Sequence, residues 1–587
     1  MARDEAYKDF IKEALIDPIR SVLIVDDDYP TLDEMLSASS AGRGSETGAA
    51  PRKVKSWVQD PGSVKAVLDH FRSLAVLVDV DDASEGTGET PAEVARHLHQ
   101  SDLLILDYHL DESDSGDRAI DIARAVAAND HFNLVVVNTR HTLSEVFENM
   151  LLGLLTPLDC LTQEADREAA DGAIADVEGD FPDAQDRIKE SIGLKHYMYA
   201  FRHGPSGFRD AIQGKGIFGE FKSKLDEFKI HPRHARPILL WALGEFQESQ
   251  REKMSARSCG TFEWSDEAPF WIRSDRLFMA FSEKAKGRKP LEVLLEALCR
   301  WGPPPSRLIL AKFRAEMEAK GVVGESKVVA DTLATAHWYL TLLKAEEDAR
   351  NVLIEESIGR HAEQLVDDVA NQVRVFADKL SSADRAVGEA AFPARISERF
   401  GTGAGDVAGR EAAFAANAVA CSKTPRAWHL HTGHIFSMDR QLWVCLTPIC
   451  DMVPGQKRAG HRGEVGSRKP FIAVRLHPLK DGQLEGLDVN SNNYLFLKLD
   501  GKVRVYSSVE GGSADPQPHW YLFYADDFGK VGQDLTFKLS RLRDVGGSLT
   551  VELCDAKIVS ELRYEYAINL MHKLGGSLTR VGLDFSV

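Results

Sequence analysis

Four short apolar runs in the first 140 residues alternate with segments of helical periodicity. The runs are SVLIV (21–25), LAVLV (74–78), DLLIL (102–106) and NLVVVN (133–138). Near-continuous Val, Ile and Leu residues are typical of strands buried on both faces, and such strands are usually parallel. The intervening segments 91–100 and 117–129 carry apolar residues with a spacing near that of an α-helix. This order predicts a doubly wound α/β fold around a parallel sheet, and we place its domain at 1–155.

The pattern changes twice along the remaining chain. Residues 156–194 are rich in Ala, Asp and Glu, which indicates an acidic linker or insertion, and residues 195–400 have helical periodicity with short Pro/Gly breaks. From 425 to 587 the runs alternate and are separated by turn residues, as in WYLFYA and KVRVYSSV, which predicts a β-rich module with one late helix. We further expect a leading helix at 7–20, an insertion at 38–60 and a final strand at 580–587.

Composition limits the classes of protein that fit this pattern. The 587 residues carry a net charge of -19, which disfavours non-specific binding to nucleic acid or to an anionic membrane. The N-terminal residues lack the apolar core of a signal peptide, and no apolar stretch reaches the length of a membrane helix. The seven cysteines are scattered and odd in number, so we expect a reduced, cytoplasmic protein with no disulfide framework.

Polar residues end three of the four predicted N-terminal strands. Asp26, Asp27 and Asp28 follow the first strand, Asp107 follows the third, and Asn138 and Thr139 end the fourth. Ligands and catalytic groups collect at the carboxyl ends of parallel strands, so these side chains should converge. Clustered carboxylates favour Mg²⁺, and an aspartate beside that ion can act as a nucleophile toward a phosphoryl group. Asp28 has the simpler interpretation of an N-cap for the helix that follows.

The motifs VLIVDDD, LLILDYHLD and VVVNT at these spacings resemble the receiver domain of two-component response regulators, a flavodoxin-like fold. The resemblance covers about residues 15–155. It implies that Asp26 and Asp27 hold Mg²⁺, that Asp107 accepts the phosphoryl group and also contacts the metal, and that the backbone carbonyl of His109 is a further metal ligand. Thr139 corresponds to the residue that senses the phosphoryl group, and a histidine kinase is the implied partner.

One element of the receiver pattern is missing at its expected place. Receivers have a lysine at the end of a fifth strand, soon after the fourth helix. After TLSEVFENMLLGLLTP there is no such strand, and the next lysines are Lys189 and Lys195. Two interpretations follow: the lysine arrives from elsewhere after an insertion, or the site is degenerate and does not accept phosphate.

The C-terminal module holds the other candidate ligands, namely His429, His431, His434, Cys445, Cys450 and Asp451. They include no CxxC pair and no regular His spacing, so we do not expect zinc. The segments GHIF, LTPICDM and LTRVGLDF resemble a β-rich module of bacterial conflict and phage-defence genes, which implies that setting but no activity. The most basic helical stretch, 300–321, equally fits a solvated helix face, so nucleic-acid binding is not favoured.

The sequence thus predicts a signalling protein in which a receiver-like domain, modified at Asp107 or docked on a kinase, controls a C-terminal output. One alternative is a phosphorylation-independent scaffold with a degenerate receiver. Another is a metal-dependent effector enzyme in the C-terminal module. Whether the chain is an enzyme, what its output is and whether it forms a homo-oligomer are left open.

Overall fold

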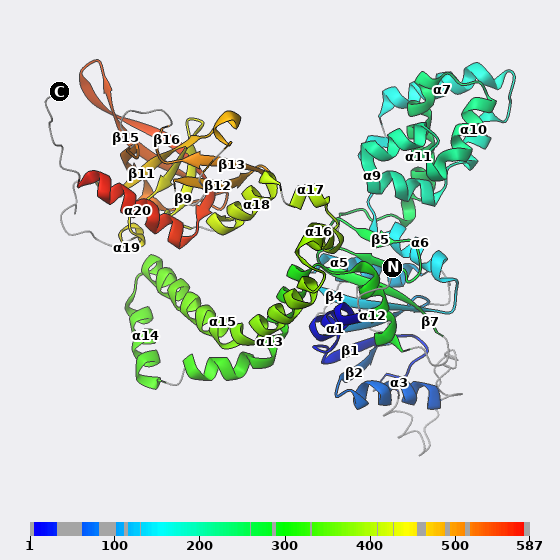
Figure 1. Cartoon of the computed structure of the whole chain (residues 1–587), viewed down its shortest axis with the longest axis horizontal. Coiled ribbons are helices and arrows are strands. Elements are labelled where there is room, and N and C mark those ends of the chain that lie inside the picture. The colour runs from blue at the N-terminus through cyan, green and yellow to red at the C-terminus, as the bar shows by residue number, and fades with distance from the viewer. Residues whose placement is uncertain are drawn as a thin grey trace, which may run out of the picture. The chain divides into compact units, whose positions relative to one another are not determined.

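The computed structural model divides the chain into two compact units, Met1–Lys312 and Phe313–Val587, which we describe separately (Figure 1). The residues described are 5–31, 34, 61–81, 101–110, 116–129, 131–161, 163–258, 260–284, 289–328, 331–407, 409–425, 428–454, 465–485, 487, 493–510 and 517–579. The insertion expected at 38–60, the helix expected at 91–100 and a final strand expected at 580–587 lie outside them.

The first unit is built on a seven-stranded sheet. Its strands, in spatial order, are β2 (Leu77–Asp81), β1 (Ser21–Val25), β3 (Leu103–Asp107), β4 (Asn133–Thr139), β7 (Leu277–Glu283), β6 (Trp271–Arg273) and β5 (Glu263–Ser265). The first five are parallel, and β6 and β5 are antiparallel at the edge. This is the predicted doubly wound α/β fold, in the strand order that also occurs in flavodoxin-like proteins.

Strand β2 begins three residues later than the sequence predicts. The preceding helix α3 (Pro61–Ser73) is followed by a turn in which Ala75 has a φ of 59°. Leu74 and Val76, which made the run 74–78 look like a strand, therefore belong to the turn and its exit. Leu77 is 77% exposed, because β2 lies at the edge of the sheet.

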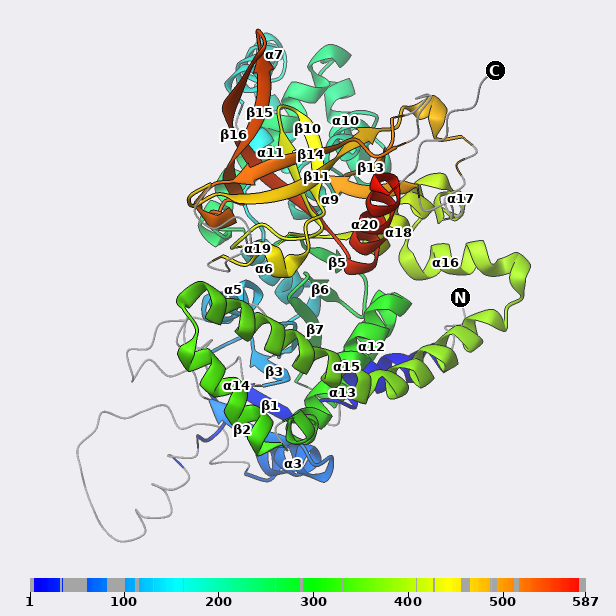
Figure 2. The ribbon, with the colours of Figure 1, turned by 90° about the vertical axis from the view of Figure 1, so that its left-hand side faces the viewer.

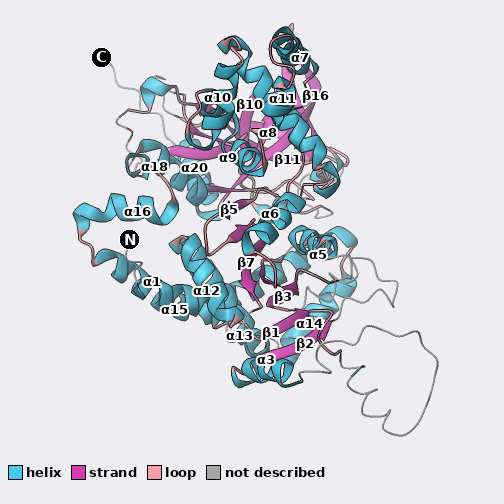
Figure 3. Cartoon of the chain, turned by 90° about the vertical axis from the view of Figure 1, so that its right-hand side faces the viewer, coloured by secondary structure: helices cyan, strands magenta, loops and turns pink. Residues whose placement is uncertain are grey.

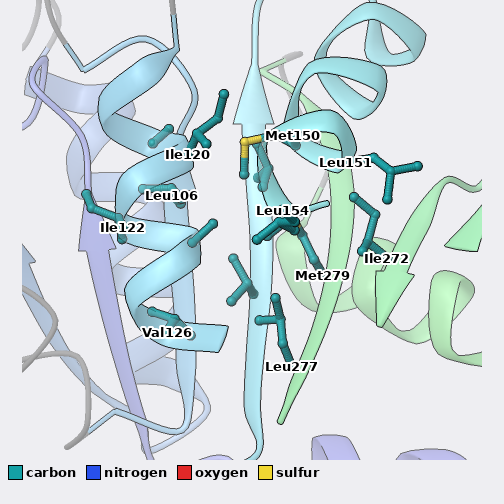
Figure 4. Packing of buried hydrophobic residues seen from close by; sticks show 14 of the residues in the cluster. Leu106, Ile120, Ile122, Val126, Met150, Leu151, Leu154, Ile272, Leu277 and Met279 are labelled. Carbon is teal, nitrogen blue, oxygen red and sulfur yellow. The ribbon is translucent and has the colours of Figure 1, made fainter. Parts of the chain in front are cut away.

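Helices cover both faces of this sheet (Figure 3). On one face, α5 (Asp117–Ala128) and α6 (Leu143–Leu154) pack with Leu106, Leu277 and Met279 into a continuous apolar core (Figure 4). Because side chains alternate along a strand, Phe278 points to the opposite face. There its ring stacks at 5.2 Å on Trp301, the last residue of α12 (Pro290–Trp301). The leading helix α1 (Glu5–Ile11) and the π-helical turn Lys12–Ile16 also contact α12.

A helical lobe is inserted between α6 and the return of the chain to the sheet. Its helices are α7 (Glu164–Glu178), α8 (Ala184–Glu190), α9 (Leu194–Ile212), α10 (Gly219–Glu227) and α11 (Ala235–Ser249). They share a core of their own, in which Tyr197, Phe218, Phe221 and Phe228 are almost completely buried. The acidic segment 156–194 therefore contains two helices of this lobe. The stretch 195–400, for which the pattern indicates only helices, contains β5, β6 and β7.

The second unit begins with helices, as predicted. These are the C-terminal part of α13 (Pro305–Val328), then α14 (Thr332–Lys344), α15 (Glu347–Arg385), α16 (Phe392–Phe400), α17 (Ala404–Val407) and α18 (Arg410–Cys421).

The predicted β-rich C-terminal module contains a closed barrel (Figure 2). Its six strands, in order around the barrel, are β10 (Gln441–Cys445), β9 (His434–Met438), β16 (Ser548–Leu562), β15 (Thr536–Val545), β14 (Trp520–Ala525) and β11 (Lys469–Pro478), and β11 pairs back to β10. Phe436, Phe471, Phe523 and Phe537 meet inside. A hairpin of β12 (Tyr494–Leu499) and β13 (Lys502–Ser507) extends from β11, and α20 (Tyr564–Leu578) contributes to a second apolar cluster.

Candidate functional site

The carboxyl ends of four parallel strands bring polar side chains to one edge of the first sheet. Asp26 follows β1, Asp107 ends β3 and Thr139 ends β4, as the sequence predicts. Lys284 follows directly after β7, and its backbone N–H donates to the carbonyl of Thr139 at 2.8 Å. The fifth parallel strand therefore carries a lysine to the same edge.

Lys284 is the residue that sequence reasoning missed. Its ammonium donates to Asp26 Oδ2 at 2.9 Å and to Asp107 Oδ2 at 2.6 Å. The side chains of both aspartates are about 6% exposed, and that of Lys284 is 16% exposed. The structure agrees with the first of the two interpretations of the missing lysine, because Lys284 reaches the site after a long insertion.

Lys284 only partly offsets the negative charge of the buried aspartates at this edge. Burial raises the pKa of Asp107 to about 6; Lys284 opposes this rise, and Asp26 and Asp27 add to it. Burial alone would lower the pKa of Lys284, but the carboxylates of Asp26 and Asp107 raise it above its usual range. The pKa of Tyr29 is raised to about 12, by burial first and then by Asp26. A single lysine thus leaves the carboxylates undercompensated, which is the condition that favours binding of a divalent cation.

The three consecutive aspartates have different surroundings. One carboxylate oxygen from each of Asp26, Asp27 and Asp28 lies within 4.8 Å of the others, so the group could hold a metal ion. Asp28 Oδ2 also accepts from Arg140 at 2.9 Å, across to the segment after β4. The backbone N–H of Asp28 donates to Asp26 Oδ1 at 3.0 Å, which helps to orient that carboxylate.

The interpretation of Asp28 as a helix N-cap is wrong. Thr31 and Glu34 bond reciprocally instead: the Thr31 N–H donates to the Glu34 carboxylate at 3.1 Å, and the Glu34 N–H donates to Thr31 Oγ1 at 3.3 Å. This is the pattern of a capping box, and it makes Thr31 the capping residue. Asp28 is thereby left to pair with Arg140.

Thr139 and His109 lie beside the carboxylates. Thr139 is fully buried, and its Oγ1 accepts from the backbone N–H of His141 at 3.0 Å. The His109 ring lies against His141 and Tyr108, with centroid distances of 4.2 and 4.7 Å. The ring is therefore used in packing, and the metal role implied by the resemblance belongs to the backbone carbonyl of His109.

The basic stretch 300–321 uses several of its cations within the chain. Arg307 lies over the rings of Phe132 and Trp301. Lys312 pairs with Glu13 at 3.0 Å, and Arg314 pairs with Glu318 at 2.6 Å. These contacts agree with the interpretation of the stretch as ordinary helix surface.

The candidate ligands of the C-terminal module differ in their surroundings. Cys445 is buried in the barrel core, where burial raises the pKa of its thiol to about 12, and Cys450 is exposed near Asp451. Three histidines lie together instead, with ring centroids 5.8 Å apart for His429 and His431 and 3.6 Å apart for His431 and His434. Glu561, which the sequence did not single out, lies beside them.

The comparisons with known proteins point to the same part of the chain. The family model described as a response receiver domain matches residues 18–180, from just before β1 to the end of α7. No curated protein and no solved structure matches the chain. The match supports a receiver domain in the N-terminal unit and, with it, a signalling or regulatory role. Within the part of the chain that the structure describes, no helix has the length and apolarity to cross a membrane.

Proposed function

We propose that the N-terminal unit is a phosphorylation-competent receiver whose acceptor is Asp107. The observation that carries the proposal is the bridging of Asp26 and Asp107 by the ammonium of Lys284, at 2.9 and 2.6 Å. A receiver needs a nucleophilic carboxylate, a cation site and a fixed positive charge for the phosphoryl oxygens. The residues proposed for these three roles lie together at one edge of the sheet, although Lys284 is 177 positions from Asp107 in the sequence.

The proposed reaction is transfer of a phosphoryl group to a carboxylate. An oxygen of Asp107 attacks phosphorus, the bond between phosphorus and the donor atom breaks, and the bonding electron pair leaves with the donor. Asp26, Asp27, Asp107 and the carbonyl of His109 would hold Mg²⁺, which neutralises charge on the phosphoryl oxygens. Lys284 would move from the carboxylates to a phosphoryl oxygen.

The pKa of Asp107 fits a nucleophile that works at neutral pH. With a pKa of about 6, the side chain is mostly ionised at pH 7 and above. A bound divalent cation lowers that pKa further because it favours the charged form.

Thr139 supplies the means by which phosphate would change the protein. Its hydroxyl oxygen accepts a backbone hydrogen bond within the segment after β4, and a turn of the side chain toward a phosphoryl oxygen, to which the O–H would donate, would move that oxygen away. That exchange would release the His141 N–H and bias the start of α6 between two arrangements. A histidine kinase is the proposed phosphate source, and the helical and barrel parts of the second unit are the proposed output. A phage-defence setting rests on the resemblance of the C-terminal segments alone.

The phosphorylation-independent scaffold is the second candidate. It predicts that no ammonium lies near Asp107, whereas Lys284 lies 2.6 Å from it. This contact favours the phosphorylation-competent interpretation.

Binding of beryllofluoride, a stable mimic of the phosphoryl group, tests the proposal in the full-length chain. Isothermal titration calorimetry with Mg²⁺ should detect one site in the wild type and none in Asp107→Asn. Asp28→Asn is the matched control and should keep the site, because Asp28 lies in the same acidic group but is paired with Arg140 and is not one of the proposed metal ligands. Equal binding by wild type and Asp107→Asn, or no binding by either, would refute the assignment of Asp107.

A further inference from the structure

A cluster of ligand-type side chains lies at one end of the C-terminal barrel. His434 begins β9, and Glu561 lies directly opposite it on β16, beside a shift in strand register between Ile558 and Ser560. His431 lies in the turn that leads into β9, and its carbonyl accepts from the His434 N–H at 3.2 Å. The barrel fold thus brings together two residues of one turn and a glutamate 127 positions after His434.

The separations between the two Nε2 atoms and the Glu561 carboxylate are too long for hydrogen bonds. His431 Nε2 lies 3.9 Å from Glu561 Oε1, and His434 Nε2 lies 4.0 Å from Glu561 Oε2. Two ligand atoms bound tetrahedrally to one zinc ion, at bonds of about 2.1 Å, are about 3.4 Å apart. Small shifts of the side chains would therefore bring all three residues onto a single ion.

His434 has an unsatisfied nitrogen that faces this space. The residue is completely buried, and its Nε2 has no hydrogen-bond partner among the described residues. An unpaired polar atom in such a place is costly.

The surroundings also orient the other two side chains. His431 Nδ1 lies 2.9 Å from the carbonyl of Thr432, to which it can donate. In that tautomer the ring lone pair is on Nε2. Lys423 on the short strand β8 (Ser422–Lys423) pairs with Glu561 Oε1 at 2.9 Å. Such outer contacts to a histidine and a carboxylate are the kind that support metal ligands.

A simpler interpretation is an ion pair between the half-exposed Lys423 and the buried Glu561, beside the two histidines. It accounts for Oε1 of Glu561, but it leaves His434 Nε2 without a partner and Oε2 at 4.0 Å from it. An ion placed between the three residues satisfies both atoms at once.

We propose that His431, His434 and Glu561 bind one Zn²⁺ ion. Two imidazoles and one carboxylate are a ligand set that zinc accepts, whereas Mg²⁺ prefers oxygen ligands only. Three protein ligands leave a fourth position for water or substrate, and the buried His429 lies on the side of His431. The His431 N–H donates to His434 Nδ1 at 3.1 Å, which places the ring proton on Nε2. Zinc binding at Nε2 therefore requires that this hydrogen bond breaks and that the ring proton moves to Nδ1.

Zinc content of the full-length chain tests this site. The protein is stripped with a chelator, incubated with a small excess of Zn²⁺, desalted and measured by mass spectrometry of the metal. We expect wild type to hold one more zinc per chain than Glu561→Gln or His431→Ala. His477→Ala is the matched control, because His477 belongs to the same barrel and also has a nitrogen without a partner among the described residues, but it lies against His519 and belongs to no group of potential metal ligands among those residues.

A second readout separates loss of the site from loss of the fold. Cobalt(II) bound to the wild-type chain should give the visible absorption of a four-coordinate site, and zinc should abolish that absorption. Equal zinc content in wild type, Glu561→Gln and His431→Ala, or wild type without zinc and without the cobalt spectrum, would overturn the proposal. None of these outcomes depends on phosphorylation at Asp107, so the two proposals fail separately.

Discussion

Replacing Asp107 by Asn should stabilise the first sheet, and the gain should grow with pH. Asp107 has a pKa of about 6 in the folded protein and 3.8 as its ordinary value, because burial penalises the carboxylate. A pKa raised on folding stabilises the fold at low pH, and that contribution is lost as pH rises through about 6. The difference of about two pKa units is worth about 3 kcal/mol. Relative to wild type, the variant should therefore gain less than about 1 kcal/mol at pH 4 and up to about 3 kcal/mol at pH 8.

Hydrogen exchange measured by mass spectrometry gives this quantity locally, in the full-length chain. Peptides that cover β1, β3 and β4 report the free energy of opening of the sheet, and divalent cations are removed because they would lower the pKa of Asp107. Lys284 keeps Asp26 as a partner in the variant, so the ammonium is not left alone. Asp28→Asn should change the opening free energy by less than about 1 kcal/mol at any pH, because Arg140 is largely exposed. A variant that is less stable than wild type at pH 8, or a gain that does not depend on pH, would refute the reasoning.

Other substitutions test neighbouring parts of the account. Lys284→Ala should destabilise the sheet at pH 8 by about 2–4 kcal/mol, because two buried carboxylates lose their cation, and Mg²⁺ should restore part of the loss in the same exchange experiment. Thr139→Ala should still bind beryllofluoride, but this binding should no longer change hydrogen exchange at the start of α6. Thr139→Ser should recover that change. Gly153→Ala should cost about 1–3 kcal/mol, because a Cβ there would overlap with the buried Cγ2 of Ile120. Gly172→Ala, with open space around its Cα, should be neutral or stabilising by up to about 1 kcal/mol in thermal unfolding.

Much of the fold could be predicted from the sequence because the parallel strands are almost entirely apolar. Strands β1, β3 and β4 lie within one residue of the runs that predicted them. Strand β15 was missed, since its sequence TFKLSRLRDV interrupts the apolar residues with charged ones that point away from the barrel core. The fifth parallel strand was missed for another reason. Its sequence LFMAFSE lies after the inserted helical lobe, in a region whose neighbours all have helical periodicity.

The candidate site was predictable only where its residues follow strands that were themselves recognised. Asp26, Asp107 and Thr139 could be placed at one edge because β1, β3 and β4 had been identified. Lys284 could not, because its strand had not been identified, although the lysine directly after LFMAFSE is a signal that could have located it. Glu561 has no local pattern, and only the pairing of β16 with β9 brings it to His434.

Mapping of the phosphorylated residue tests the central claim most directly. The full-length chain is incubated with Mg²⁺ and acetyl phosphate, and borohydride then reduces any aspartyl phosphate to homoserine, which peptide mass spectrometry can locate. The account predicts homoserine at position 107, dependent on Mg²⁺. It also predicts much less homoserine in Lys284→Ala. Homoserine at another aspartate, or none at position 107 under conditions in which the wild-type chain is folded, would contradict it.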